Sequence, residues 1–571
     1  MKPFAHLAPL SVLVSVFTAC TGPAPPAITT AEVPAAKGCG PVLTDDKAWY
    51  TSGKHEPFLA GLDGLHYPIT TDSDSAQHYF DQGLVLAYGF NHAEAARSFW
   101  EATRTDATCA MAWWGFAYVL GPNYNAGMEP DSYARAYEAI GKAQALSGTC
   151  TEKEKGLISA LALRYTADAP EDRAPLDKAY SEALRELTAH YAEDADIAAM
   201  FAESLMDQHP WDLWEKDGKE KAWTPEIIAA LERSMKTFPT HFGAHHLYIH
   251  AVEASLTPER ALPSAEFLGS AVPGSGHLTH MPSHIYIRTG RYHQGVVANQ
   301  HSVTVDSGYT ALCHAQGMYP LGYFPHNIHF LSTCAAMEGN SAVAWSSAMD
   351  LRDHLAKSLF AEPGWSTLQH FQGYPYFVGV KLELWDKLRA EPLPDSAWTY
   401  ATALWHYGQG RMSAHMGDLA AARHHLEDLR VAAADTVVAA MRIWGINPAP
   451  MILAVAINVL EGEVLLAEGK QDEGIARLTD GVTAEDALQY QEPPDWSFPV
   501  RHDLGAALLH AKRYDEAEAV YRADLVNWPE NGFALTGLKR ALEGAGKKAD
   551  ADALTTRISK AFAYADKTLT L

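Results

Sequence analysis

The residues best suited to chemistry in this sequence are histidines, and they are crowded into residues 241–330. Nine of the chain's 27 histidines lie in three short segments of that stretch: His241, His245, His246, His250, His277, His280, His284, His326 and His329. Each buried imidazole must find hydrogen-bond partners or cost free energy, so packing alone does not explain the crowding. The density indicates a functional region, although it does not name a reaction.

The spacing within these segments favours a transition-metal site. His246, His250 and Glu253 stand at positions i, i+4 and i+7, on one face of a helix. Imidazole is a common ligand of zinc, iron and copper ions, and one carboxylate among histidines suits zinc or non-haem iron. Leu247 stands where the zinc-protease motif H-E-x-x-H has its glutamate, so this segment is not that motif. In a metal site Glu253 would act as a ligand or as a catalytic general base.

The elements that must position these residues are helices. From Ala76 onward, helical segments alternate with turns, and strand-like alternation is scarce. Gly83 is followed by Ala95 twelve residues later and by Phe99 sixteen residues later. Similar spacings start from Gly410, Gly462 and Gly505. Two antiparallel helices need small side chains where they cross and a large one to fill the gap beside the crossing.

This spacing resembles the tetratricopeptide repeat, a helix-turn-helix unit of about 34 residues. The likeness is strongest in residues 76–122 and 498–545, and the whole chain is similar to bacterial tetratricopeptide-repeat (TPR) lipoproteins with a histidine-rich central region. The resemblance implies an all-α fold, a TPR-like helix-turn-helix solenoid wound as a right-handed superhelix. It implies no particular activity, because the repeat serves many functions.

The repeat register places the central histidines on one surface. Ile249, Ser283 and Ser332 are taken as helix-crossing positions, with turns at Gly290 and Gly339. One face of the first helices then carries the residues predicted to bind metal: His246, His250, Glu253, His277, His280, His284, His326 and His329. In tetratricopeptide repeats that face lines the concave groove, so the resemblance implies that these side chains converge.

These candidates outnumber the four ligands of a structural zinc ion. Either two metal ions bind, or some residues orient the ligands or contact substrate. Pro282 is expected in a first helical turn, with His277 and His280 in the loop before it. Asp207 and the acidic segment at residues 485–496 are further candidates to line or close the groove.

The N-terminus predicts export and lipid anchoring. Lys2 precedes a largely apolar run at residues 7–17, and Phe17-Thr18-Ala19-Cys20 resembles a bacterial lipobox with Cys20 as the lipidated residue. Thr21 in place of aspartate indicates the outer membrane, on its periplasmic side or surface. An ordinary secretory signal is the alternative. No other segment is expected to span a membrane.

We divide the chain into a signal peptide (1–20), a tether with an irregular N-terminal segment (21–75), N-terminal TPR-like repeats (76–240), histidine-rich central repeats (241–345) and C-terminal TPR-like repeats (346–571).

The net charge of −25 argues against nucleic acid as a partner, and against membrane contact beyond the lipid anchor. Cys109 with Cys150 and Cys313 with Cys334 are candidate disulfides, and buried unreactive thiols are the alternative.

Three functions fit these features. The first is an envelope-anchored repeat protein with a His/Glu transition-metal site (zinc, iron or copper), acting as a metal-dependent hydrolase or oxidoreductase. The second is a non-catalytic scaffold that binds a protein or peptide in its groove, with the histidines as recognition or pH-sensing residues. The third is metal storage or delivery. The sequence leaves open whether the protein is an enzyme.

Overall fold

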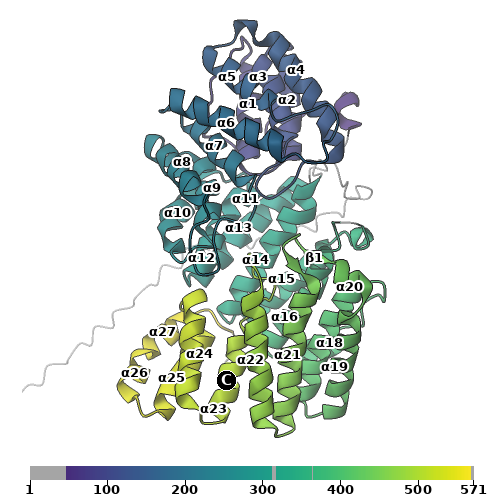
Figure 1. Cartoon of the computed structure of the whole chain (residues 1–571), viewed down its shortest axis with the longest axis vertical. Helices are drawn as coiled ribbons and strands as arrows, with labels where there is room; N and C mark the ends of the chain where they lie inside the picture. Colours follow the sequence, from purple (N-terminus) through teal and green to yellow (C-terminus); the bar gives the residue numbers. More distant parts are fainter. Residues whose placement is uncertain (1–46, 312–316, 363, 567–571) are drawn as a thin grey trace, which may run out of the picture. The chain divides into compact units, whose positions relative to one another are not determined.

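The computed structural model describes residues 47–311, 317–362 and 364–566, which belong to one compact unit. Over these residues the chain is all-α, a TPR-like array of helix-turn-helix pairs with one small β-hairpin. Figure 1 shows successive helices lying side by side in chain order. The predicted fold class is confirmed. The predicted signal peptide, Cys20 and most of the tether lie outside the described residues.

The helices and strands have the following bounds. The N-terminal helices are α1 (Asp74–Tyr88), α2 (His92–Thr105), α3 (Ala110–Val119), α4 (Tyr133–Leu146), α5 (Glu152–Ala162), α6 (Ala174–His190), α7 (Ala195–Met206) and α8 (Thr224–Thr237). The central elements are α9 (Phe242–Val252), α10 (Leu262–Ala271), α11 (Gly276–His280), α12 (Pro282–Arg288), α13 (Tyr292–Ala311), the π-helical turn η5 (Tyr319–Tyr323), α14 (Phe324–Met337) and α15 (Ser341–His354). The C-terminal elements are α16 (Leu368–Lys381), α17 (Trp385–Ala390), α18 (Thr399–His415), α19 (Leu419–Ala433), α20 (Thr436–Ala440), β1 (Arg442–Ile443), β2 (Asn447–Pro448), α21 (Ala449–Ala467), α22 (Gln471–Ala487), α23 (Val500–His510), α24 (Tyr514–Asn527), α25 (Gly532–Gly544), α26 (Lys548–Ala553) and α27 (Thr555–Ala561). Short 3-10 turns are η1 (Trp49–Thr51), η2 (Pro130–Ser132), η3 (Ser147–Thr149), η4 (Pro258–Ala261) and η6 (Lys357–Leu359).

The helix crossings use the small and large residues that the sequence predicts. A Cβ added at Gly83 of α1 would lie 2.8 Å from the ring of Phe99 on α2, and one added at Gly115 of α3 would lie 2.3 Å from it. Around Tyr521 of α24, the corresponding distances are 2.4 Å from Gly505 and 2.1 Å from Gly537. Each aromatic ring therefore fills a space that exists because its neighbours have no side chain.

Local signals set the ends of the central helices. The His241 side chain caps α9, since its Nδ1 accepts the backbone N–H of Ala244 at 2.9 Å. Gly290 and Gly339 occupy the predicted turns with φ of +71° and +82°, values that favour glycine. Helix α12 begins at Pro282, as expected. The expected loop before it is wrong, because His277 and His280 lie on the short helix α11, which the Ser275 side chain caps.

The hydrophobic core of the described chain has two clusters, and they meet at the histidine-rich segments. One cluster extends from Leu62 to Tyr323 and the other from Ile287 to Leu554. Ile285 belongs to the first and Ile287 to the second, so their boundary runs through α12. Helix α9 is buried on all sides, which is typical of a core helix. Its histidines therefore lie in the protein interior.

Three details differ from or extend the sequence interpretation. Within the described residues, helix α21 is long and apolar enough to cross a membrane by length and composition, contrary to the expectation. It packs against α18, α19 and α22 in the repeat array. Cys109 and Cys150 are buried free thiols, so the alternative of buried thiols is confirmed for them and the candidate pairing is wrong. Cys313 lies outside the described residues. The β1–β2 hairpin turns at Trp444 and Gly445, both with positive φ.

Candidate metal centre

Six of the seven histidines predicted to bind metal form one continuous set of neighbouring rings, and the carboxylate of Glu253 contacts two of them. They come from α9 (His246 and His250), α11 (His277 and His280), α12 (His284) and α14 (His326). Five of them are at most 2% exposed, and His326 is half-buried. Consecutive rings along this set lie 4.8–6.3 Å apart, centroid to centroid. We call these six residues the histidine cluster.

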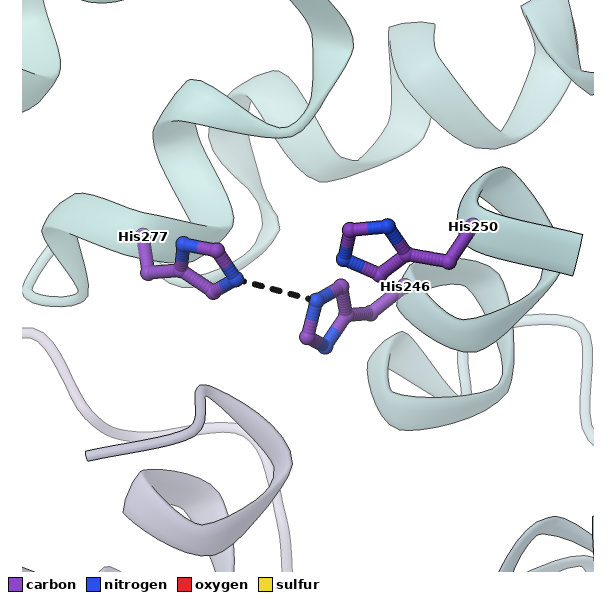
Figure 2. Close-up of side chains that lie close together, drawn as sticks. All are labelled: His246, His250 and His277. Carbon is purple, nitrogen blue, oxygen red and sulfur yellow. Dashed lines mark hydrogen bonds between the residues drawn. The ribbon is translucent and has the colours of Figure 1, made fainter. Parts of the chain in front are cut away.

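The first part of the cluster contains His246, His250 and His277, and Figure 2 shows their rings. One ring nitrogen from each lies within 4.8 Å of the other two. The Nε2 atoms of His246 and His277 are 3.1 Å apart, the contact drawn as a dashed line in Figure 2. His250 Nε2 and His277 Nδ1 are buried with no hydrogen-bond partner in the described part of the chain. Buried polar nitrogens without partners are uncommon, and binding a metal ion is one role that would explain them.

The second part contains His280, His284 and His326. His284 Nε2 lies 2.9 Å from His280 Nε2 and 3.5 Å from His326 Nε2. Two nitrogen ligands of one tetrahedral ion, at about 2.0–2.1 Å from the metal, would be about 3.3–3.4 Å apart. The observed spacings are therefore close to those around a shared ion.

Glu253 joins the two parts. Its Oε1 lies 2.8 Å from His250 Nδ1, and its Oε2 lies 2.6 Å from His284 Nδ1. Both carboxylate oxygens are thus engaged as hydrogen-bond acceptors. Burial opposes ionisation of Glu253, but His284 and His250 outweigh it and lower the pKa of the carboxyl to about 2. This placement lets Glu253 orient two imidazoles, and it also keeps Glu253 among the side chains that could share an ion with His250 and His284.

The hydrogen-bond partners fix which ring nitrogen carries hydrogen. His246 Nδ1 faces the backbone oxygen of Tyr88 at 2.6 Å, and His280 Nδ1 faces Asn299 Oδ1 at 2.6 Å. Asn299 Nδ2 donates to the Gly295 backbone oxygen at 2.7 Å, which leaves its Oδ1 toward the imidazole. Carbonyl and carboxylate oxygens only accept, so Nδ1 must donate in these histidines, as it does in the two beside Glu253. In each neutral ring the Nε2 then carries a lone pair.

This assignment leaves two lone pairs facing each other. His280 Nε2 and His284 Nε2 are 2.9 Å apart, and their Nδ1 atoms already donate to Asn299 and Glu253. Two acceptors at that distance repel unless a cation, either a proton or a metal ion, lies between them.

Burial lowers the pKa of four cluster histidines well below the usual range, and neighbouring histidines add to the effect: His246, His277, His280 and His326. The neutral imidazole favoured by burial is the form that binds metal.

A cavity of 410 Å³ opens onto the cluster, and we call it the central cavity. His250, His284 and His326 line it. Among its other lining residues are Tyr124, Asp177, Arg173, Asp207, Trp211, Tyr323, Trp444, Gln491 and Glu492. Trp211 and Tyr124 stack at 5.5 Å between ring centroids. The cavity therefore combines aromatic walls with polar groups, as small-molecule sites do.

Two buried carboxyl groups face this cavity, Asp207 and Glu492. Burial raises the pKa of both well above the usual range. Arg164 Nη2 donates to Asp207 Oδ2 at 2.5 Å, and the Tyr490 hydroxyl donates to Glu492 Oε1. Both residues belong to segments that the sequence singled out as groove candidates. Burial therefore holds Glu492 in its neutral, proton-donating form, whereas Asp207 is paired with the Arg164 guanidinium.

The remaining histidines of the segment lie elsewhere. His329 packs against Tyr374, with ring centroids 4.2 Å apart, and toward His370 at 6.3 Å. His245 contacts Ser264 Oγ at 2.8 Å and lies outside the histidine cluster.

Sequence reasoning did not identify several residues that shape the site. The Tyr88 backbone carbonyl has no side-chain signal, and Asn299 lies on α13 without a recognisable motif. Tyr124 and Trp444 reach the central cavity from a loop and from the hairpin turn. The turn pair Trp444–Gly445 was the one local signal that could have drawn attention to this segment.

Comparisons with known proteins give no family. No protein-family profile and no curated protein sequence matches the chain. Among solved structures, a human IFIT1 dimer with m7Gppp-AAAA is 11% identical, with a TM-score of 0.32 and coverage of 86% of this chain and 91% of that one. Yeast Tom70 is 11% identical, with a TM-score of 0.27 and coverage of 86% and 93%. The Cut9 and Hcn1 hetero-tetramer is 14% identical, with a TM-score of 0.31 and coverage of 83% and 78%. Likeness at this level carries no argument about function.

Proposed function

We propose that this helical-repeat protein binds a transition metal through the Nε2 atoms of its histidine cluster, and that the central cavity gives a ligand access to that metal. The observation that carries the proposal is the pair of Nε2 lone pairs on His280 and His284, held 2.9 Å apart. Their orientation is enforced by acceptors on the opposite nitrogens. Metal-binding histidines are commonly held in this way, with the second nitrogen bonded to a carboxylate or carbonyl.

A metal ion explains more of the site than a proton does. One proton between His280 and His284 would relieve the repulsion of their lone pairs. It would not bind the lone pair of His326 Nε2, which lies 3.5 Å from His284 Nε2. It would also leave His250 Nε2 buried and unpartnered within the described chain. A metal ion accepts several lone pairs at once, and three imidazoles with an open position are typical of catalytic zinc sites. Zinc, iron and copper all suit this donor set.

The central cavity supports a role beyond storage. His250, His284 and His326 line both the cluster and the cavity, so a bound ion would be within reach of a small molecule or peptide. The carboxyl group of Glu492 lies on the same cavity, and burial holds it in the neutral form that would supply a proton to a bound ligand. We therefore favour a metal-dependent enzyme, hydrolase or oxidoreductase, over a storage protein.

The test is metal analysis of the chain carrying Cys20→Ala and no histidine tag. We expect wild type to retain transition metal after dialysis, and the double variant His246→Gln/His280→Gln to lose most of it. His245→Gln is the matched control, because His245 is the buried neighbour whose nitrogens contact Ser264 Oγ and the Pro239 backbone oxygen instead. A wild-type protein that stays metal-free after loading with zinc, iron(II) and copper would refute the proposal.

The second candidate is a scaffold that binds a protein or peptide, a common use of TPR-like repeats. The observation that favours it is the fold, together with a further cavity of 570 Å³ lined by residues such as Trp214, Arg288 and Trp528. The scaffold would bind its partner equally well with EDTA present and in the His246→Gln variant. Binding that needs the metal would favour the first candidate.

We also propose that Cys20 anchors the chain to the bacterial outer membrane. The lipobox-like sequence before Cys20 supports this. Metabolic labelling with radioactive palmitate should modify the wild-type chain and spare Cys20→Ser. Labelling of both chains, or of neither, would count against the anchor.

A further inference from the structure

We infer that the histidine cluster is a two-ion centre, with one ion on His246, His250 and His277 and one on His280, His284 and His326, and that a small anion from the central cavity bridges the ions. This inference rests on the proposed function and deepens it. It specifies the number of ions, which side chain holds each, and the chemical class of the ligand.

The six histidines form two sets of three, and a third close group, His250, Glu253 and His284, is the hydrogen-bonded link between them. Within each set, ring nitrogens of all three histidines lie within 4.8 Å of one another. One ion held at about 2 Å from nitrogen can serve one such set, because the span of all six rings is too large for its coordination sphere. The sets are contiguous, since the rings of His250 and His284 are 5.2 Å apart and those of His277 and His280 are 5.8 Å apart. Two ions in adjacent three-nitrogen sites follow from this division.

Glu253 gives both sites a common support. One of its oxygens accepts from His250 of the first set, and the other accepts from His284 of the second set. A single carboxylate therefore orients one imidazole at each ion. Because its two oxygens are engaged with Nδ1 hydrogens, it does not also bridge the ions. The bridging position is left to a ligand from outside the chain.

Charge points to the class of that ligand. The six imidazoles must be neutral to bind metal, and Glu253 supplies one negative charge in contact with the cluster. Two divalent ions would bring four positive charges into a buried site, which is costly without further compensation. A bound anion lowers this charge and completes the coordination of both ions.

The cavity reaches both sites. His250 of the first set and His284 and His326 of the second set line the same 410 Å³ space. A small anion entering there meets both ions rather than one. The aromatic walls of Tyr124, Trp211 and Trp444 leave room for a larger substrate behind the anion.

The experiment uses copper(II) as the metal and azide as the anion, on the full chain carrying Cys20→Ala. We expect two copper ions per chain by elemental analysis after dialysis. Azide should lower the electron-spin count to less than half of the copper present, because bridged copper(II) ions couple. The variants His246→Gln and His326→Gln should each retain one ion with an undiminished spin count. His326 is half-buried, so its variant is expected to fold, and melting curves check both.

Three outcomes would overturn the inference. One copper ion per chain, lost in both variants, would mean a single site and leave the proposed function intact. Two ions with a full spin count in azide would mean separate sites without a shared anion, again leaving the proposed function intact. No retained metal in folded wild type would remove both proposals.

Discussion

Replacing Glu253 by glutamine separates the orientation of the histidines from their presence. Glutamine keeps the shape of the side chain but replaces one acceptor oxygen with an NH2 donor. In wild type both oxygens accept Nδ1 hydrogens, from His250 at 2.8 Å and from His284 at 2.6 Å. In Glu253→Gln one of these imidazoles must move its hydrogen to Nε2. That ring then has no lone pair for a metal ion.

The size of the effect follows from this loss of one oriented ligand. Removing a partner that orients a metal ligand costs about 10- to 100-fold in affinity, which is about 1.4–2.8 kcal/mol. The metal-free protein should respond in the opposite direction. If His284 carries its hydrogen on Nε2, it can donate to His280 Nε2 at 2.9 Å, and the repulsive contact becomes a hydrogen bond. A buried hydrogen bond of this kind stabilises by about 0.5–1.5 kcal/mol.

The assay is a metal titration against a coloured chelator, paired with urea unfolding in EDTA. Glu253→Gln should bind metal 10- to 100-fold more weakly, while its free energy of unfolding in EDTA stays level or rises. Glu338→Gln is the control, because Glu338 accepts from His293 Nδ1 at 3.0 Å outside the cluster. Unchanged metal affinity in Glu253→Gln would refute the assigned orientation. Complete loss of binding would instead identify Glu253 as a direct ligand.

Three further predictions concern the rest of the fold. Burial lowers the pKa of Lys381 to about 7, so its amine should acylate half-maximally near pH 7, rather than near the ordinary lysine value of about 10.4, in peptide mass mapping. Burial raises the pKa of Asp306 to about 7, above the unfolded value of about 3.9, so the stability it gives is complete below pH 4 and is lost as pH rises through 7. Urea unfolding should show a fall of about 4 kcal/mol from this group between these limits, and the fall should be absent in Asp306→Asn. Gly115→Ala should destabilise by about 1–3 kcal/mol, because the new Cβ would lie 2.3 Å from the Phe99 ring, whereas Gly141→Ala meets no atom within 4 Å and should be neutral or stabilising in a thermal melt.

The repeat architecture could be predicted because it depends on the spacing of small and aromatic residues that are close together in the sequence. A glycine and an aromatic residue sixteen positions apart fix where two helices cross, and Gly83 with Phe99 and Gly505 with Tyr521 meet as that spacing requires. These contacts join neighbouring helices of one repeat, so the pattern does not depend on distant parts of the chain. The division of the core into two clusters was not predicted, because it depends on how successive repeats stack.

The histidine cluster was predictable in membership but not in detail. His326 and His329 are three residues apart on α14, so a helix model placed both on one face. A rise of about 1.5 Å per residue carries His329 about 4.5 Å further along the helix. There it meets Tyr374 of α16 rather than the cluster. A residue's face on a helix follows from sequence, whereas the partner facing it depends on tertiary packing.

The role of Glu253 shows why the chemistry of the site needed the structure. Sequence spacing placed His246, His250 and Glu253 together, and residue type made all three candidate ligands. The structure adds the orientation, because Glu253 faces the Nδ1 atoms of His250 and His284, whereas the Nε2 atom of His284 faces those of His280 and His326. The Tyr88 carbonyl and the Asn299 side chain likewise accept from the Nδ1 atoms of His246 and His280. None of these acceptors is part of a recognisable sequence motif. Four imidazoles oriented by four acceptor atoms, from α1, from the residue that follows α9 and from α13, would be an unusual coincidence in a structural core. A core needs each ring to have partners on both sides, whereas a metal site needs one side left open, and three rings of the cluster, those of His250, His284 and His326, line the central cavity.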